Sequence, residues 1–274
     1  YSKHLLVSIK SLRETNKRIP IYIFYLNFPK KLINRLENCD LNLKLIRIDK
    51  NKLNLIRSKN KIYFYRFFSP VILKRYKKIL YLDLDTIVIG NLNSIFNLNL
   101  KKYIIGAVKE PNSPAKPEFH YLKETKKRFN TGVILFNVKK WNQEKFTQKI
   151  IRLTKDKKFF YTTDQPVANE LLYGKIKLIN KKWNYLDSYD LKDIKNVKII
   201  HFNRYKPWKS INRSPFKYLY YKYYQFLYYR YKEQPKYDLY NKFSEESKNG
   251  FFKDDTNFQS VFSKIKKYLR KNSN

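Results

Sequence analysis

The sequence is poor in glycine, cysteine and methionine. Its 274 residues include five glycines, one cysteine and no methionine. No two glycines are close enough to form a G-x-G-x-x-G or Walker loop, or a G-x-S-x-G nucleophile elbow, which excludes dinucleotide folds and P-loop NTPases. The single Cys39 excludes an internal disulfide and a cysteine-rich zinc site, and fits a reducing compartment. No apolar run of about 18 residues and no signal peptide is visible, so no transmembrane helix is predicted.

Acidic residues are also scarce. Lysine and arginine total 60 against 22 acidic residues, a formal charge of +38. Such a charge attracts polyanions, including nucleic acids, acidic lipid surfaces and phosphorylated substrates. Because the charge is spread along the chain, and lysine, asparagine, isoleucine and tyrosine are abundant together, a coding bias explains it as well. Charge alone therefore identifies no partner.

Helical and extended apolar patterns alternate along residues 1–210, which predicts an α/β domain with a mixed, mostly parallel sheet flanked by helices. Helices are expected at 2–14, at 61–76 with an interruption at Pro70, at 139–154, and from a cap at Asp164 to residue 173. Strands are expected at 21–25, 43–48, 79–82, 86–89, 103–108, 133–136, 176–179 and 197–201.

The composition changes at about residue 211, so we expect a catalytic domain at 1–210 and a basic, tyrosine-rich appendage at 211–274. Segment 216–232 interleaves lysine and arginine with tyrosine and contains no acidic residue. This pattern predicts contact with an anionic membrane surface. A helix face of Tyr220, Tyr224, Leu227 and Tyr231 packed on the catalytic domain is the alternative.

Two aspartates follow an apolar strand in Tyr81-Leu82-Asp83-Leu84-Asp85. Carboxylates spaced in this way can share one Mn²⁺ or Mg²⁺, and open α/β sheets bind ligands at strand ends. His201 ends another apolar strand and is a competent third ligand, or else a core histidine. Solvated carboxylates in a turn are the alternative for the two aspartates.

Three further polar sites stand at the ends of predicted elements. Lys206 follows His201 and can meet a phosphate, or be an exposed lysine. Asn130, before a strand, offers a donor and an acceptor to sugar hydroxyls, or is a turn residue. Asp164 and Gln165 begin a helix, where capping and catalysis are compatible roles.

Together these motifs resemble glycosyltransferase family 8, retaining enzymes of the Rossmann-like GT-A fold that include glycogenin and bacterial lipooligosaccharide galactosyl- and glucosyltransferases. The resemblance covers about residues 1–210. It rests on the order and spacing of Tyr63-x-x-Arg66, Pro70, the segments 79–88 and 129–133, Lys140-Trp141, Asp164-Gln165, Trp183-Asn184-Tyr185, His201-Phe202 and Lys206-Pro207-Trp208.

The resemblance implies transfer of galactose or glucose from a UDP-sugar to a saccharide acceptor, such as a lipid-linked surface glycan, at the cytoplasmic face of a membrane. It implies that Mn²⁺, with Mg²⁺ as the alternative, is bound by Asp83, Asp85 and His201. It places Arg66 and Lys206 at the diphosphate or sugar, and Leu84 near the ribose. The remaining implied site residues are Asn130, Asp164 and Gln165 around the sugar and Tyr1 in the donor site.

The sequence departs from the family pattern at two places. Arg204 stands where the family has a glycine ahead of Lys-Pro-Trp, and that loop is one residue shorter. The segment that starts at Tyr1 matches the family from the tyrosine of an Asn-Tyr motif onward. The preceding strand, with its uracil-binding aspartate, is missing, so we expect a fragment that begins within a motif.

Two other functions fit parts of the sequence. A haloacid-dehalogenase-type phosphohydrolase also carries Asp-x-Asp after an apolar strand, but it needs Thr or Val where Ile87 stands. It also needs a late acidic pair after a strand, and Asp254-Asp255 lies in a polar stretch instead. A nucleic-acid-binding protein fits the charge and the tyrosines, yet no RNP motif, zinc finger or clear helix-turn-helix is present, so we expect no specific nucleic-acid partner.

Overall fold

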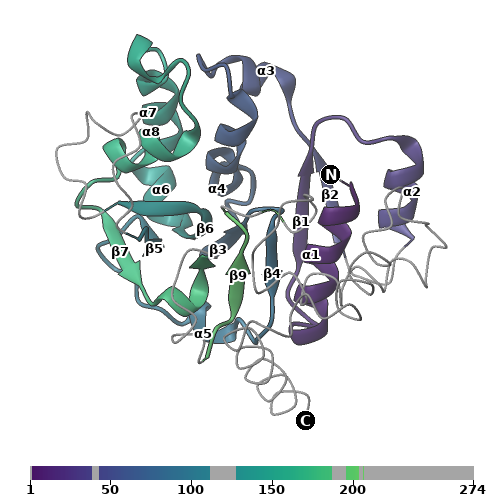
Figure 1. Ribbon diagram of the computed structural model, residues 1–274. Coiled ribbons are helices and arrows are strands. Elements are labelled where there is room, and N and C mark those ends of the chain that lie inside the picture. The colour runs from purple at the N-terminus through teal and green to yellow at the C-terminus, as the bar shows by residue number, and fades with distance from the viewer. Residues whose placement is uncertain (1, 39–42, 112–127, 187–195, 204–205, 207–274) are drawn as a thin grey trace, which may run out of the picture. The chain divides into compact units, whose positions relative to one another are not determined.

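A computed structural model of the chain describes residues 2–38, 43–111, 128–186, 196–203 and 206 (Figure 1). These residues belong to two compact units, each assembled from separate stretches of sequence. The first unit holds the described residues of 2–17, 84–90 and 185–206, and the second holds those of 18–83 and 91–184. The chain passes from one to the other between Asp83 and Leu84. Tyr1 and the predicted appendage at 211–274 lie outside the described residues.

The first unit contains one long helix and three short strands. Helix α1 (Ser2–Thr15) has the helical apolar spacing that the sequence predicts, and it packs against β4 (Thr86–Val88). Strand β4 pairs antiparallel with β9 (Ile199–His201), which pairs in parallel with β8 (Tyr185–Leu186). The hydroxyl of Ser11 accepts a hydrogen bond of 2.9 Å from the Val88 N–H, so this helix also satisfies the backbone of β4.

The second unit contains two sheets. Strands β1 (Ile21–Tyr25) and β2 (Leu43–Arg47) form a parallel pair. The larger sheet has the order β3-β6-β5-β7, with bounds Lys78–Leu82, Phe129–Asn137, Ile105–Lys109 and Ile176–Ile179. Strand β6 is antiparallel to both neighbours, and β5 is parallel to β7. The predicted mixed α/β fold is confirmed, although among the described strands antiparallel pairings are as numerous as parallel ones.

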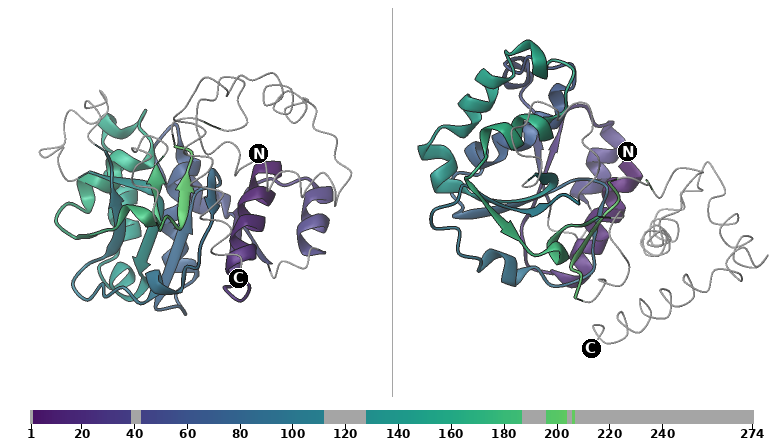
Figure 2. Two further views of the ribbon diagram at one scale, coloured as in Figure 1. Left: turned by 60° about the horizontal axis from the view of Figure 1, so that its bottom comes forward. Right: turned by 60° about the vertical axis from the view of Figure 1, so that its left-hand side comes forward.

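Helices pack on one another and on this larger sheet in the second unit. Helix α8 packs on β6 and α7 packs on α8, and in Figure 2 the teal helices of this unit lie beside its teal strands. The α-helices are α2 (Lys30–Glu37), α3 (Lys50–Asn54), α4 (Ser69–Ile72), α5 (Asn93–Phe96), α6 (Val138–Gln143), α7 (Phe146–Leu153) and α8 (Asp164–Leu171). In the described part of the chain the 3₁₀-helices are η1 (Lys61–Phe68), η4 (Lys157–Phe159) and η5 (Lys181–Trp183).

Two helices predicted from the sequence are built differently in the structure. The one expected over 61–76 is the 3₁₀-helix η1 followed by α4, and Pro70 lies in the first turn of α4 rather than interrupting it. Proline suits that turn because its fixed φ is helical and its missing N–H would have no partner there. The helix expected over 139–154 is divided into α6 and α7 at Lys145, whose φ of 53° is left-handed.

The break at Lys145 allows Phe146 to enter the core beside Trp141, whose indole is fully buried. The indole lies 4.9 Å from the ring of Phe136 in an edge-to-face arrangement and 5.3 Å from the ring of Phe146. Its N–H donates to the Thr147 hydroxyl at 2.9 Å, which in turn donates to the Phe67 carbonyl at 2.7 Å. One threonine therefore satisfies two buried polar groups between α6, α7 and η1.

We expect Thr147→Val to lower the free energy of unfolding by about 1–3 kcal/mol, because it leaves the indole N–H of Trp141 and the carbonyl of Phe67 buried without partners. The matched control is Thr163→Val, at an exposed threonine that makes no capping hydrogen bond. Urea denaturation followed by tryptophan fluorescence measures both variants. Equal midpoints for the two variants would show that the buried relay contributes no stability.

Candidate active site

Asp85 and His201 face each other across a short antiparallel pair in the first unit. Thr86 is opposite His201 in the β4–β9 register, and the Phe202 N–H donates to the Asp85 carbonyl at 2.9 Å. This backbone pairing brings the side chains together, with His201 Nε2 lying 3.3 Å from Asp85 Oδ1. Both side chains are largely buried. The prediction that His201 ends a strand and lies beside the Asp-x-Asp segment is therefore confirmed.

Lys206 lies on the other oxygen of Asp85. Its ammonium group contacts Asp85 Oδ2 and donates to the Phe202 carbonyl at 2.6 Å. Burial by itself raises the pKa of Asp85, but His201 and Lys206 outweigh burial and hold that pKa well below its usual range. Asp85 is thus an anion at every pH at which the protein would work, as a metal ligand must be.

Asp83 directly follows β3 in the second unit and is fixed by its neighbours there. Its N–H donates to the Gly132 carbonyl at 2.7 Å, which extends the β3–β6 pairing by one residue. Arg66 reaches both carboxylate oxygens, with Nη2 3.0 Å from Oδ1 and Nη1 3.4 Å from Oδ2. The Tyr81 hydroxyl donates to Oδ1 at 2.7 Å. Two of these three contacts are made by Oδ1.

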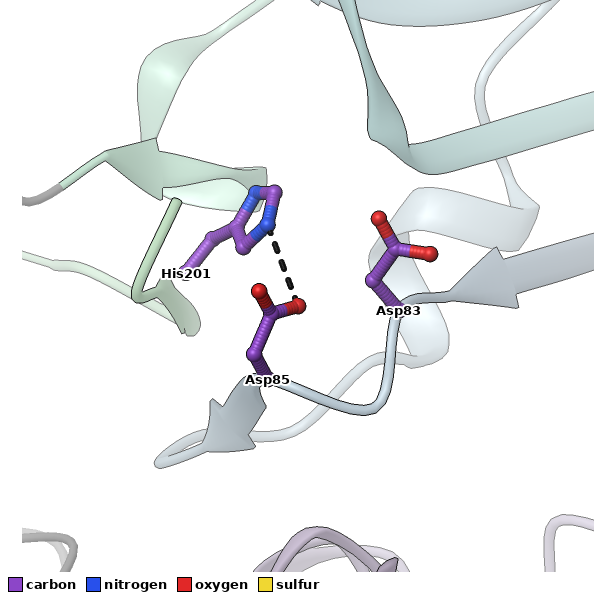
Figure 3. A group of neighbouring side chains, drawn as sticks. All are labelled: Asp83, Asp85 and His201. Atoms are coloured by element: carbon purple, nitrogen blue, oxygen red, sulfur yellow. Dashed lines mark ion pairs between the residues drawn. The ribbon is translucent and has the colours of Figure 1, made fainter. Parts of the chain in front are cut away.

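Only Leu84, in a turn, separates Asp83 from Asp85. One carboxylate oxygen of each aspartate and a ring nitrogen of His201 lie within 4.8 Å of one another, as Figure 3 shows. Ligand atoms on opposite sides of a divalent cation are about 4–5 Å apart, so the spacing fits one ion. Two hard carboxylate oxygens with one imidazole nitrogen suit Mn²⁺. The three residues predicted as ligands are thus brought together.

A buried carboxylate, that of Asp164, also contacts Arg66. Asp164 Oδ2 is 3.2 Å from Arg66 Nε, but that oxygen accepts no hydrogen bond from the described residues. Burial raises the pKa of Asp164 to about 6, and the attraction of Arg66 opposes this rise without cancelling it. Asp164 is the first residue of α8, and Thr163 rather than Asp164 is its N-cap, so the predicted capping role is wrong.

The pairing of β5 with β6 is irregular where the other polar residues lie. Ala107 pairs with Ile134, whereas Lys109 pairs with Phe129, so β6 carries extra residues between those two points. Irregularities of this kind re-aim side chains and are common beside active sites. Asn130, Thr131 and Gly132 occupy this stretch. Asn130 is thus within β6, and the alternative of a turn residue before the strand is excluded.

The amide of Asn130 is held by its own strand and by Asn184. Its Oδ1 accepts hydrogen bonds of 2.9 Å from the Gly132 N–H and from Asn184 Nδ2. Its Nδ2 donates to Gln165 Oε1 at 3.3 Å. The sequence suggested a donor and an acceptor for a sugar, but the oxygen already has two protein donors. A ligand would therefore meet Asn130 mainly through its remaining N–H.

The structure arranges the predicted residues as two groups. Asp85, His201 and Lys206 lie together in the first unit, and Arg66, Asp83, Asn130, Asp164 and Gln165 lie together in the second, with Leu84 in the turn between the aspartates. Sequence reasoning missed Tyr81, Thr131 and Glu110. A usable signal existed for Glu110, because it follows strand β5 as directly as Asp83 follows β3.

We expect Asp164 to oppose folding above about pH 6. With a pKa of about 6 in the folded chain and 3.8 as its ordinary value, the folded state binds the proton more tightly. The free energy of unfolding that this carboxyl contributes therefore falls as pH rises from about 4 to about 6. The free energy of unfolding of Asp164→Asn, compared with that of the unaltered chain, should rise by about 2 kcal/mol from pH 4 to pH 7. Urea denaturation at both pH values measures this change.

Asp156→Asn is the control for this measurement, because that carboxylate is exposed and caps η4. A gain for Asp164→Asn no larger than that of the control would contradict the raised pKa of Asp164.

Comparison with known proteins matches the family model described as "Glycosyl transferase family 8" to residues 1–212. Glycosyltransferase GlyB of Streptococcus pneumoniae serotype 4 is 26% identical over 241 residues, which are 79% of this chain and 57% of GlyB. Lipopolysaccharide 1,2-glucosyltransferase of Escherichia coli K12 is 26% identical over 230 residues, or 74% of this chain and 68% of that enzyme. This chain therefore spans little more than half the length of some of its curated relatives.

Among solved structures, galactosyltransferase LgtC in complex with donor and acceptor sugar analogues superposes with a TM-score of 0.68. The match covers 86% of this chain and 94% of LgtC. Because the identity is 18%, the match shows a shared fold and nothing further. That fold is the expected GT-A fold. Since the family model matches most of the sequence, including both groups of the candidate site, the chain belongs to glycosyltransferase family 8.

Proposed function

We propose that the protein is a metal-dependent retaining glycosyltransferase that moves a hexose, galactose or glucose, from a UDP-sugar to a saccharide acceptor. The observation that carries this proposal is the group formed by Asp83, Asp85 and His201, whose ligand atoms lie within 4.8 Å of one another. Membership of the family supports the type of reaction. The domain that performs it would be residues 1–210.

The metal ligands suit the departure of a nucleoside diphosphate. A bound Mn²⁺ or Mg²⁺ would act as a Lewis acid that neutralises the charge developing on the leaving diphosphate. Asp83, Asp85 and His201 would hold the ion. Lys206, whose ammonium group contacts Asp85, carries a positive charge that would also serve a phosphate. Leu84, between the two aspartates, would offer its backbone to the ribose, and Tyr1 would complete the donor site.

Retention of configuration requires either a covalent intermediate or attack on the same face of the sugar. Asp164 is a carboxylate that Arg66 holds in place, so it is the candidate nucleophile for the first route. Gln165 is a poor nucleophile, because its amide oxygen lies against the Asn130 amide and both the N–H and the hydroxyl of Thr131. We therefore assign Gln165, together with Asn130, to orienting the sugar. Arg66 would act through the two carboxylates more than on the donor.

The acceptor we propose is a surface glycan, including lipid-linked ones such as lipopolysaccharide or lipooligosaccharide. The names of the relatives support this class, since one of them is a lipopolysaccharide glucosyltransferase. The alternative functions have less support. A dehalogenase-type nucleophile at Asp83 would have to attack while bound to Arg66 and Tyr81. A nucleic-acid-binding protein would have no need of the metal-ligand group.

A panel of UDP-sugars tests the proposed function by release of UDP, with and without Mn²⁺. We expect turnover with UDP-galactose or UDP-glucose, and a loss of about 10²-fold or more in Asp85→Asn, which keeps the shape but removes charge from the ion site. Mn²⁺ binding followed by calorimetry should weaken in the same variant. Asp156→Asn, at an exposed carboxylate, is the matched control. Full activity of Asp85→Asn in EDTA would exclude the metal assignment.

Segment 216–232 carries the second part of the proposal, a contact with the anionic inner face of a membrane. It lies outside the described residues, and among those described no helix is both long and apolar enough to cross a bilayer. The support is therefore local composition, in which tyrosine rings suit the headgroup boundary and each nearby cation adds about 1 kcal/mol of attraction.

We expect the protein to sediment with anionic vesicles and to ignore neutral ones at modest salt. Changing Lys217, Lys222 and Arg230 together to glutamine should weaken the anionic binding by about 10²-fold, following from about 1 kcal/mol for each charge. Transfer to a small soluble sugar should change little. Equal sedimentation of the altered and unaltered proteins would show that this segment does not provide the contact.

A further inference from the structure

Glu110 lies at the carboxyl end of β5, beside the irregular stretch of β6. Its N–H donates to the Arg128 carbonyl at 2.9 Å, which holds its backbone against the residue that precedes β6. Its carboxylate accepts a hydrogen bond of 2.9 Å from Gln165 Nε2. Glu110 is half-buried, so this bond is partly shielded from water. No motif considered above includes Glu110, and the proposed function assigns it no role.

The surroundings of Gln165 permit one orientation of its amide group. The Thr131 N–H faces Gln165 Oε1 at 3.2 Å, and a backbone N–H can only donate. The Glu110 carboxylate faces Nε2, and an ionised carboxylate can only accept. Rotating the amide by half a turn would place two donors together on one side and two acceptors together on the other. The two ends of the amide are therefore distinguished by Thr131 and Glu110.

We propose that Glu110 is a positioning residue for sugar transfer, which fixes the orientation of the Gln165 amide and so presents one Nε2–H to the bound sugar. This inference rests on the proposed function, in which Gln165 touches the sugar. Nε2 carries two hydrogens, and the bond to Glu110 uses one of them. The second hydrogen is the polar hydrogen that this amide offers to a ligand. Without Glu110, the amide keeps its bonds to Asn130 and Thr131 but loses the contact that directs Nε2.

The same bond connects two elements that carry site residues. Gln165 is in the first turn of α8, one residue after Asp164, and its Oε1 contacts the irregular stretch of β6. Glu110 therefore ties the end of β5 to α8 at the point where β5 and β6 lose their regular register. Errors of about 1 Å in such positions can reduce a rate by about 10²-fold, so the bond matters for the chemical step more than for binding the donor.

Steady-state kinetics of three variants test the proposal. Glu110→Ala removes the acceptor and should lower kcat by about 30–100-fold, with KM for the UDP-sugar within about threefold. Glu110→Gln keeps an oxygen that can accept from Nε2 and should stay within about fivefold of the unaltered kcat. Glu110→Asp is shorter by one methylene and should fall between them. Glu144→Ala, at a surface glutamate that bonds Lys175, should leave kcat unchanged.

The pattern across the variants separates positioning from other roles. A kcat for Glu110→Ala within threefold of the unaltered protein would overturn the proposal. It would also be overturned if Glu110→Gln were as slow as Glu110→Ala, because the charge and not the accepted hydrogen bond would then matter. Thermal midpoints within a few degrees of one another would show that the lower kcat values do not result from unfolding of the variants.

A measurement that needs no turnover tests the contact itself. The side-chain NH₂ signals of Gln165, identified by their absence in Gln165→Leu, should move in Glu110→Ala and stay close to their original shifts in Glu110→Gln. Unmoved signals in Glu110→Ala would overturn the inference whatever the kinetics. If the unaltered protein transferred no hexose from any UDP-sugar, the proposed function would fail, while these signals would still decide whether Glu110 orients Gln165.

Discussion

A buried guanidinium between two carboxylates organises the second unit of this protein. Arg66 is 6% exposed, stacks over the Tyr81 ring with 4.6 Å between Cζ and the ring centroid, and donates to the Thr131 carbonyl at 2.6 Å. Burial disfavours its charge, but Asp164 and Asp83 more than compensate and raise its pKa further. An arginine is required here, because a planar group with five N–H donors can meet two carboxylates and the backbone carbonyls of Tyr63 and Thr131 at once.

The two carboxylates contact that guanidinium in different ways. Both oxygens of Asp83 lie on Arg66, and one of them also accepts from the Tyr81 hydroxyl. One oxygen of Asp164 lies 3.2 Å from Arg66 Nε. Burial raises the pKa of Asp164 to about 6, because the attraction of Arg66 offsets only part of that rise and the nearby charge of Asp83 adds to it. The guanidinium thus joins a candidate metal ligand to a carboxyl whose charge changes near neutral pH.

Sequence patterns predicted most elements of the fold because those elements are long or strongly apolar. Strands at 21–25, 79–82 and 176–179 and helix α1 appear where expected, since their residues alternate or recur with the correct period. Short elements such as α2, α3, α5 and β8 were not predicted, because two to eight residues carry little periodicity. The division at Lys145 escaped for another reason. A left-handed lysine is imposed by the fit of Phe146 against Trp141, which no local pattern records.

The site shows the same division between local and long-range information. Asp83, Asp85 and His201 were predicted because the two aspartates come after one apolar strand and the histidine ends another, and strand ends bring ligands together. The partners of Arg66 were not predicted, since they come from η1, β3, β6 and α8, and only the folded chain places them around one group.

Glu110 depended on both kinds of information. Its position after β5 was visible in the sequence. Its proposed role depends on the irregular register of β6, which brings Thr131 to one end of the Gln165 amide while Glu110 lies at the other. The role of a polar residue at a strand end therefore depends on how the neighbouring strand pairs at the same position in the sheet. In this protein the neighbouring strand departs from regular pairing, so the polar groups of β5, β6 and α8 converge on one amide.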